Sequence, residues 1–300
     1  MKFSRFLPAF AALALSALSA SAMDVSTARG TVSVEGVPKT IAVYDAAAID
    51  TLNRLGIHPA GVPDKLYVPE LEAAKGNATA VGTLFEPDLE ALSALAPDLV
   101  IVGSRSAAKA EVTARVAPTL DMTIDGDNLF ADAKARLATY GDLFGKAEEA
   151  KVAAEELDAK LAAAKAAVAG KGKALIVMTN GPKVSAYGPG SRFGWVHGVL
   201  GLLPAMEDIQ SATHGEAVSF EFIREANPDW LLVLDRAVAV ASSEQAAKVT
   251  LDNELVAGTT AWKKGQVVYL PAAEFYIADG GVQSLGRVLA AITDGFSAAK

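Results

Sequence analysis

A run without glycine or proline, from Ala147 to Ala169, divides the chain and limits the folds that are open to it. The run is rich in Ala, Lys, Glu and Leu, and Gly170-Lys171-Gly172 follows it directly. These residues are strong helix formers, and glycine commonly ends a helix, so the pattern predicts one long helix over residues 146–170. The segments before and after this helix are then expected to form separate cores.

On both sides of the predicted helix, short apolar runs alternate with amphipathic stretches, which is typical of α/β structure. The runs expected to be strands are 40–43, 78–82, 99–102, 173–178, 230–234 and 267–270. The sequence therefore predicts an α/β fold of two lobes joined by one long helix, with a ligand cleft between the lobes. The N-terminal lobe is placed at residues 38–145 and the C-terminal lobe at residues 171–300.

An internal repeat supports the division into two lobes. The residues that recur with the same spacing are Glu90, Pro97-Asp98 and Arg105 in the first copy, and Glu221, Pro228-Asp229 and Arg236 in the second. A helix, a Pro-Asp pair and a strand are common in α/β proteins, but the matching Glu and Arg offsets favour a true repeat. Ligands bind beyond the carboxyl ends of the strands in open α/β sheets, so both arginines are expected to face the cleft.

The N-terminus has the layout of a secretory signal peptide, which we place at residues 1–22. Lys2 and Arg5 precede an apolar run over residues 6–17, and the small residues Ala20-Ser21-Ala22 follow. A membrane anchor would need about 20 apolar residues in succession. The chain has no cysteine, and so no residue to carry a lipid anchor. A free, monomeric periplasmic protein is the expectation.

Charge and motifs argue against two function classes. Lys and Arg number 27 against 35 Asp and Glu, and no basic stripe interrupts this acidic balance, so nucleic acid is not an expected partner. The sequence has no Gly-x-Ser-x-Gly elbow, no phosphate-binding Gly-x-x-x-x-Gly-Lys loop, no His-Glu-x-x-His and no cysteine nucleophile. We therefore expect a binding protein without a cofactor, and not an enzyme.

Three loops carry the remaining candidate binding residues, because loops on a rigid scaffold are where such residues concentrate. They present Arg192 in Gly188-Pro189-Gly190-Ser191-Arg192-Phe193-Gly194, His214 in Ala212-Thr213-His214-Gly215, and Tyr276 after the strand at 267–270. The alternatives are a solvated arginine and a tyrosine in the core. For the other two histidines, His58 and His197, structural roles are expected.

At these loops the chain resembles the bacterial periplasmic binding proteins for ferric catecholate siderophores, of the enterobactin-fragment and petrobactin type. The resemblance runs from about Thr40 to the C-terminus. It is carried by the 185–194 segment Ser-Ala-Tyr-Gly-Pro-Gly-Ser-Arg-Phe-Gly, and by Thr213-His214-Gly215, Asn227-Pro228-Asp229, Asp235-Arg236 and Leu251-Asp252-Asn253. The residues before Tyr276, Ala272-Ala273-Glu274-Phe275, are less aromatic than the family pattern.

The resemblance implies a site in which Arg105, Arg192 and Arg236 surround the anionic complex. It further implies that His214 and Tyr276 complete the coordination of Fe(III) when the siderophore supplies only two catechols. The chemistry fits, because guanidinium groups stay charged and present a planar fork of donors to catecholate oxygens. Ferric ion is a hard cation that suits phenolate oxygen and accepts imidazole nitrogen.

The resemblance also implies a partner, the ABC permease of the inner membrane. Glu90 and Glu221 match the positions at which a glutamate from each lobe docks onto the permease, although solvated helix carboxylates are the alternative. Other ligands stay open: a ferric hydroxamate, ferric citrate, haem or cobalamin. The competing class is a periplasmic enzyme that processes the siderophore.

Overall fold

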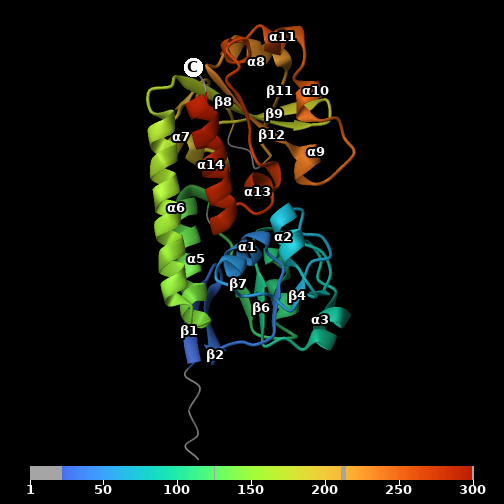
Figure 1. Cartoon of the computed structure of the whole chain (residues 1–300). Coiled ribbons are helices and arrows are strands. Elements are labelled where there is room, and N and C mark those ends of the chain that lie inside the picture. The colour runs from blue at the N-terminus through green and yellow to red at the C-terminus, as the bar shows by residue number, and fades with distance from the viewer. Residues whose placement is uncertain (1–21, 125, 211–213, 299–300) are drawn as a thin grey trace, which may run out of the picture.

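The computed structural model describes residues 22–124, 126–210 and 214–298, and it contains two α/β lobes stacked end to end (Figure 1). The predicted signal peptide, residues 1–22, lies outside the described residues apart from Ala22, which begins strand β1. The α/β fold of two lobes joined by a long helix is confirmed. The predicted lobe boundaries stay predictions.

The N-terminal lobe is built on a parallel five-stranded sheet in the order β5-β4-β3-β6-β7. Its strands are β3 (Ile41–Val43), β4 (Gly61–Val62), β5 (Thr79–Ala80), β6 (Leu99–Val102) and β7 (Thr119–Asp121), and a separate hairpin consists of β1 (Ala22–Thr27) and β2 (Gly30–Glu35). The helices are α1 (Ala46–Arg54), α2 (Pro69–Ala74), α3 (Leu89–Leu95), η1 (Ser104–Lys109), α4 (Ala110–Thr113), η2 (Gly126–Asn128) and α5 (Leu129–Leu143). The four residues of β6 are all buried, as expected of a strand covered on both faces.

The C-terminal lobe has a mixed sheet in the order β11-β9-β8-β12-β13, with β10 beside β8. Its strands are β8 (Lys173–Asn180), β9 (Lys183–Tyr187), β10 (Leu203–Pro204), β11 (Glu216–Val218), β12 (Trp230–Asp235) and β13 (Val267–Tyr269). The short helices are α7 (Trp195–Gly198), α8 (Phe220–Ala226), α9 (Arg236–Ala239), α10 (Ala247–Thr250), α11 (Glu254–Ala257), α12 (Thr260–Lys263) and α13 (Ala272–Tyr276). Strand β9 runs antiparallel to both of its neighbours, β8 and β11, and His214 shortly precedes β11.

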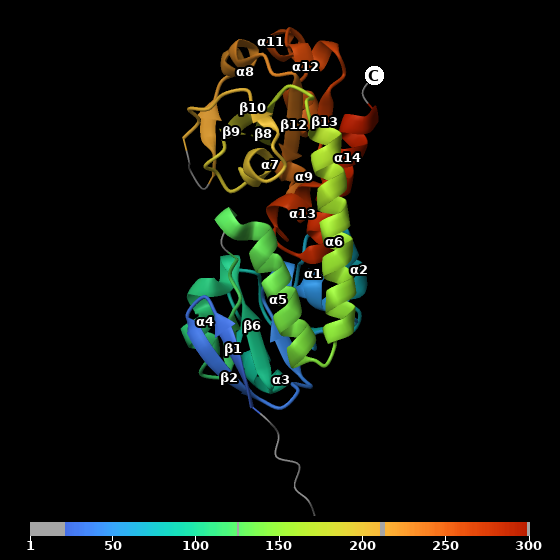
Figure 2. The same ribbon diagram turned by 90° about the vertical axis from the view of Figure 1, so that its left-hand side faces the viewer.

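Two long helices lie side by side at one edge of the molecule, where the sequence predicted one (Figure 2). Helix α6 (Ala147–Val168) is the expected linker, and α14 (Val282–Ala298) packs against it. Buried apolar residues of α14 recur every three or four positions: Val282, Leu285, Val288, Leu289, Ile292 and Phe296. These residues belong to one hydrophobic core that runs from the N-terminal sheet along α5, α6 and α14 into the C-terminal sheet.

The sequence repeat corresponds to equivalent hydrogen bonds in the two lobes. The Asp98 carboxylate accepts from the backbone N–H of Thr40 at 2.9 Å, and the Asp229 carboxylate accepts from that of Lys173, also at 2.9 Å. In return, the Asp98 N–H donates to Thr40 O and the Asp229 N–H to Lys173 O. Each Pro-Asp pair therefore fastens the start of the strand after it to the start of the neighbouring strand.

A buried carboxylate, Asp50 of α1, joins the N-terminal lobe to α14. It accepts hydrogen bonds from the backbone N–H groups of Gln283 and Ser284, at 2.7 and 3.1 Å, and from Arg287 at 2.9 Å. These amides belong to the first turn of α14, where a helix leaves N–H groups unsatisfied, so Asp50 caps a helix that is distant in sequence. Gly281 leaves room for this contact, because a Cβ there would lie 2.7 Å from the Asp50 carboxylate.

Removing this carboxylate is expected to destabilise the whole protein. Asp50→Ala leaves the Arg287 guanidinium and two amides without their buried partner, which should lower the free energy of unfolding by about 3 to 5 kcal/mol. Glu156→Ala, which removes only an exposed ion pair with Arg54, should cost less than about 1 kcal/mol. Urea denaturation of both variants measures the difference, and equal small losses would contradict a role for Asp50 in joining the lobes.

Candidate functional site

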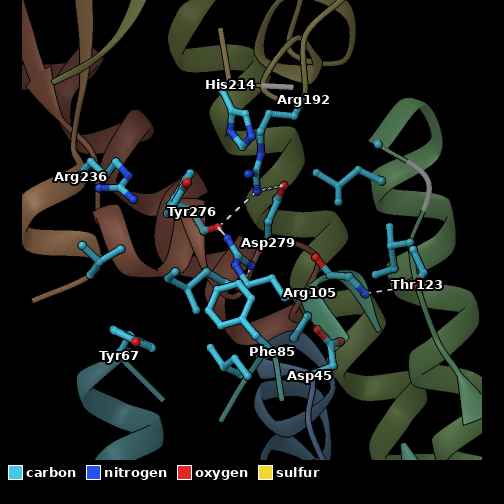
Figure 3. Close-up of a pocket in the computed structure, with 18 residues that line it drawn as sticks. Asp45, Tyr67, Phe85, Arg105, Thr123, Arg192, His214, Arg236, Tyr276 and Asp279 are labelled. Atoms are coloured by element: carbon cyan, nitrogen blue, oxygen red, sulfur yellow. Dashed lines mark hydrogen bonds and ion pairs between the residues drawn. The ribbon is translucent and has the colours of Figure 1, made fainter. Parts of the chain in front are cut away.

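A cavity of about 580 Å³ lies between the lobes, and all five predicted ligand-binding residues line it (Figure 3). Arg105 comes from η1 of the N-terminal lobe, and the other four come from the C-terminal lobe. They are Arg192 before α7, His214 before β11, Arg236 at the start of α9, and Tyr276 at the end of α13. Segments distant in sequence thus bring three guanidinium groups, an imidazole and a phenol to one cavity.

The Arg105 side chain crosses the cleft and joins the two lobes at the floor of the cleft. Its Nη2 donates to the backbone oxygen of Tyr276 at 2.6 Å, and its Nη1 donates to that of Ile277 at 3.1 Å. Burial lowers the pKa of Arg105 from its ordinary value, and the nearby positive charge of Arg192 lowers it further. Because a guanidinium group is very strongly basic, Arg105 still carries its charge at neutral pH.

Arg192 approaches the same point from the C-terminal lobe. Its Nη2 donates to the Tyr276 carbonyl at 3.2 Å, so one backbone oxygen accepts from two guanidinium groups. The Asp279 carboxylate lies 3.7 Å from Arg192 and supplies the nearest negative charge. Burial raises the pKa of Asp279 to about 6, although Arg192 and Arg105 oppose this shift. The floor of the cleft is therefore rich in positive charge.

Tyr276 is a residue of a short helix, and not of a loop as the sequence suggested. Pro271 precedes α13 and starts it, because proline is readily accommodated before the first turn of a helix. The side chain is 9% exposed, and its ring lies 5.2 Å from the Arg105 guanidinium carbon and 5.0 Å from that of Arg192. These contacts place the aromatic face of Tyr276 against two cations.

Arg236 and His214 stand where the cleft opens into a second cavity of about 660 Å³ over β9 and β11. Tyr276 lines both cavities with them, and Figure 3 shows it between Arg236 and Arg192. Arg236 donates to the side-chain oxygen of Asn180 at 3.1 Å, and the His214 side chain is exposed. These three residues are therefore available to a ligand that occupies either cavity.

Other predicted residues lie elsewhere. Glu90 on α3 and Glu221 on α8 are both exposed, and their helices occupy opposite ends of the molecule (Figure 1). Glu221 additionally lines the second cavity. His197 is buried, and its Nδ1 pairs with the backbone oxygen of Leu202 at 2.8 Å, which agrees with the expected structural role. His58 is exposed.

The cleft residues that sequence reasoning missed include Asp45, Tyr67, Phe85 and Asp279. Asp45 caps the N-terminus of α1, and burial raises its pKa to about 6. An Asp between a strand and a helix, as in Tyr44-Asp45-Ala46, is a capping signal that could have been noticed, but it does not reveal burial beside the cleft. The positions of Tyr67 and Phe85 depend on turns that no periodic pattern marks.

Comparison with known proteins gives the family. Residues 41–274 match the family described as periplasmic binding protein. The chain belongs to this family. Petrobactin-binding protein YclQ of Bacillus subtilis is 34% identical over 86% of this chain and 82% of its own, and the crystal structure of YclQ superposes with a TM-score of 0.88, at 32% identity over 92% and 99%.

Two further relatives are similar over most of this binding protein. Ferric-anguibactin-binding protein FatB of Vibrio anguillarum is 34% identical, covering 86% of this chain and 83% of its own. The periplasmic catecholate-siderophore binding protein VctP of Vibrio cholerae has a solved structure with a TM-score of 0.84, at 28% identity over 91% of this chain and 99% of that one. The expected family is thereby confirmed.

No helix in residues 22–124, 126–210 and 214–298 combines the length and hydropathy of a membrane span. Within the same ranges, no three His, Cys, Asp or Glu side chains gather as a metal site.

The partly buried carboxyl of Asp279 makes stability depend on pH. Its pKa of about 6 is higher than the value of about 4 for an unfolded chain, so its contribution to stability is complete below pH 4 and is lost as pH rises through 6. That contribution is about 2 to 3 kcal/mol.

Asp279→Asn should therefore abolish a fall of this size in the free energy of unfolding between pH 4 and pH 7, as measured by urea denaturation. Asp142→Asn, which alters an exposed carboxylate of α5, is the control. Identical pH profiles for wild type and Asp279→Asn would contradict the assignment.

Proposed function

We propose that this protein captures a ferric catecholate siderophore outside the cytoplasm and delivers it to an ABC importer, without chemical change of the ligand. The observation that carries the proposal is the convergence of Arg105, Arg192 and Arg236 from both lobes on one cavity. The binding activities named for YclQ, FatB and VctP agree with this ligand class.

The electrostatics of the cleft favour an anion. Arg105 and Arg192 are half-buried and hydrogen-bonded to a carbonyl, so their charge is only partly balanced by Asp279. Charge-assisted hydrogen bonds to oxygen anions are strong in a partly dry site, and arginine forms them with a fixed geometry. A ferric tris- or bis-catecholate carries net negative charge and presents such oxygens.

Within this proposal, His214 and Tyr276 supply the two iron-coordinating atoms that a tetradentate siderophore leaves open. Both residues border the same two cavities, and the exposed imidazole can turn toward a bound metal complex. Iron is here the cargo, which arrives and leaves with its chelator. Ferric citrate is the second candidate ligand, because its carboxylates would suit the same three arginines.

Loss of one arginine should weaken binding of the ferric catecholate strongly. For Arg192→Ala or Arg236→Ala we expect a cost of about 2 to 5 kcal/mol, which is at least about 30-fold in Kd. Arg224→Ala, an exposed change on α8 outside both cavities, is the control and should bind like wild type. Quenching of tryptophan fluorescence measures the affinity. The buried Trp195 reports on the cleft because its ring packs against Phe275, the residue before Tyr276. Unchanged Kd values for both cleft variants would exclude this site.

Direct ligation of iron by Tyr276 should be visible in the absorption spectrum. With a ferric bis-catecholate bound, Tyr276→Phe removes the phenolate and should shift the charge-transfer band relative to wild type. The ring and its contacts with Arg105 and Arg192 are retained in this variant, so packing is preserved. A band at the same wavelength in both proteins would mean that Tyr276 contacts the complex only through its ring.

We further propose that Glu90 and Glu221 dock onto the permease. Both are exposed on short helices of matching position in the two repeats, α3 and α8. Exposed charges at an interface mainly govern encounter and orientation of the partners, so these residues should affect delivery more than siderophore affinity.

The docking proposal predicts that Glu90→Ala with Glu221→Ala lowers siderophore-dependent uptake of iron-55 by cells that express the importer. Siderophore affinity should stay within about threefold of wild type. Glu148→Ala with Glu155→Ala removes the same charge from exposed positions of α6 and should leave uptake unchanged. Normal uptake by the Glu90 and Glu221 variant would exclude both residues from the docking surface.

A further inference from the structure

The N-terminal wall of the cleft carries two aromatic side chains to which the proposed function assigns no role. Tyr67 and Phe85 both line the 580 Å³ cavity, and Figure 3 shows them on the side away from His214. Phe85 is 54% exposed, which is high for a large apolar side chain. A soluble protein gains stability by burying such a ring, so its exposure at a binding cleft points to a ligand that covers it.

A rigid turn presents Phe85 to the cleft. The Thr83 hydroxyl accepts from the backbone N–H groups of Phe85 and Glu86, at 3.1 and 3.0 Å. The Glu86 carboxylate pairs with Lys109 at 2.6 Å, which ties the turn to η1. Gly82, at φ +116°, allows the chain to close tightly, because a Cβ there would lie 2.4 Å from the Glu86 carbonyl oxygen. The backbone that carries the Phe85 ring is thus held in place before any ligand binds.

Tyr67 is held in an unfavourable backbone conformation beside the same cavity. Its φ of +67° lies in the left-handed region, which costs free energy for a residue with a side chain. The Glu72 carboxylate accepts from the backbone N–H groups of Leu66 and Tyr67, at 2.6 and 3.4 Å, and thereby stabilises the turn. The Lys65 ammonium lies 4.7 Å from the Tyr67 ring centroid and adds a positive charge to this wall.

Together, the two walls of the cleft favour a ligand that combines oxygen anions with aromatic rings. Opposite the aromatic rings, the C-terminal wall presents Arg192 and Arg236, which bind oxygen anions. A catecholate joins both features in one group, since its oxygens are charged and its ring has two flat faces. Aromatic rings that pack against each other gain about 0.5 to 1.5 kcal/mol beyond the burial of their area. Citrate offers the charge without the ring.

We propose that Tyr67 and Phe85 form an aryl-binding wall that packs against the catechol rings of the ferric complex and separates aryl chelates from carboxylate chelates. This inference rests on the proposed function and adds the group that determines specificity. The competing explanation for the exposed Phe85 ring is that it packs on the C-terminal lobe, near Val240, when the lobes close. Such a contact would support every ligand equally, whereas an aryl-binding wall supports only aryl ligands.

The test titrates wild type, Phe85→Ala, Phe85→Leu and Phe85→Tyr with ferric 2,3-dihydroxybenzoate and with ferric citrate, using tryptophan quenching. Phe85→Ala and Phe85→Leu should each weaken binding of the aryl complex by about 3- to 10-fold, and Phe85→Tyr should bind like wild type. Affinity for ferric citrate should stay within about twofold. Leu203→Ala, a change at a 58% exposed residue of β10 outside this cavity, is the control for loss of a surface apolar group.

The outcomes separate the two proposals. Equal losses for both ligands, or full binding of the aryl complex by Phe85→Leu, would overturn the aryl-binding wall while leaving the proposed function intact. A wild type that binds no ferric catecholate would overturn the proposed function, and the wall with it. If wild type does not bind ferric citrate, the comparison of Phe85→Leu with Phe85→Tyr decides by itself.

Discussion

The arrangement of the two lobes depends on one buried carboxylate. Asp50 of α1 caps α14 and pairs with Arg287, which in turn lies 3.3 Å from Glu274 of the C-terminal lobe. Burial raises the pKa of Asp50, so the charged form is stable only because several donors surround it. A contact of this kind has a single good geometry. The Asp50 contact therefore fixes the position of one lobe relative to the other, and this position sets the width of the cleft.

The positions of the binding residues depend on this junction between Asp50 and α14. Arg105 reaches from η1 to the carbonyls of Tyr276 and Ile277, a short distance along the chain from the helix that Asp50 caps. The continuous core along α5, α6 and α14 resists bending at the same level, since packed interiors deform little. The guanidinium groups are thus placed before the ligand arrives, and binding does not have to pay for their ordering.

The fold was largely predictable because its signals are local. The glycine-free run at 147–169, the buried strands and the Pro-Asp repeat each record a pattern in neighbouring residues. The structure brings His214 and Tyr276 to the cleft, but the roles expected of them come from the resemblance to a known family and stay predictions. Asp279 escaped notice because its importance comes from a contact with Arg192, in a distant segment. Phe85 escaped notice because its place beside the cavity depends on the turn that carries it. The helical state of Tyr276 and the packing of α14 on α6 were missed for the same reason.

The position of α14 has a consequence for how the chain folds. Its residues complete the core between the N-terminal and C-terminal sheets, yet they lie far along the chain from the strands of the N-terminal sheet. Contacts between segments so far apart form late, because closing a long loop costs entropy before the contact repays it. The core of each lobe consequently stays incomplete until α14 has packed. The native state should then form in one cooperative step, and not lobe by lobe.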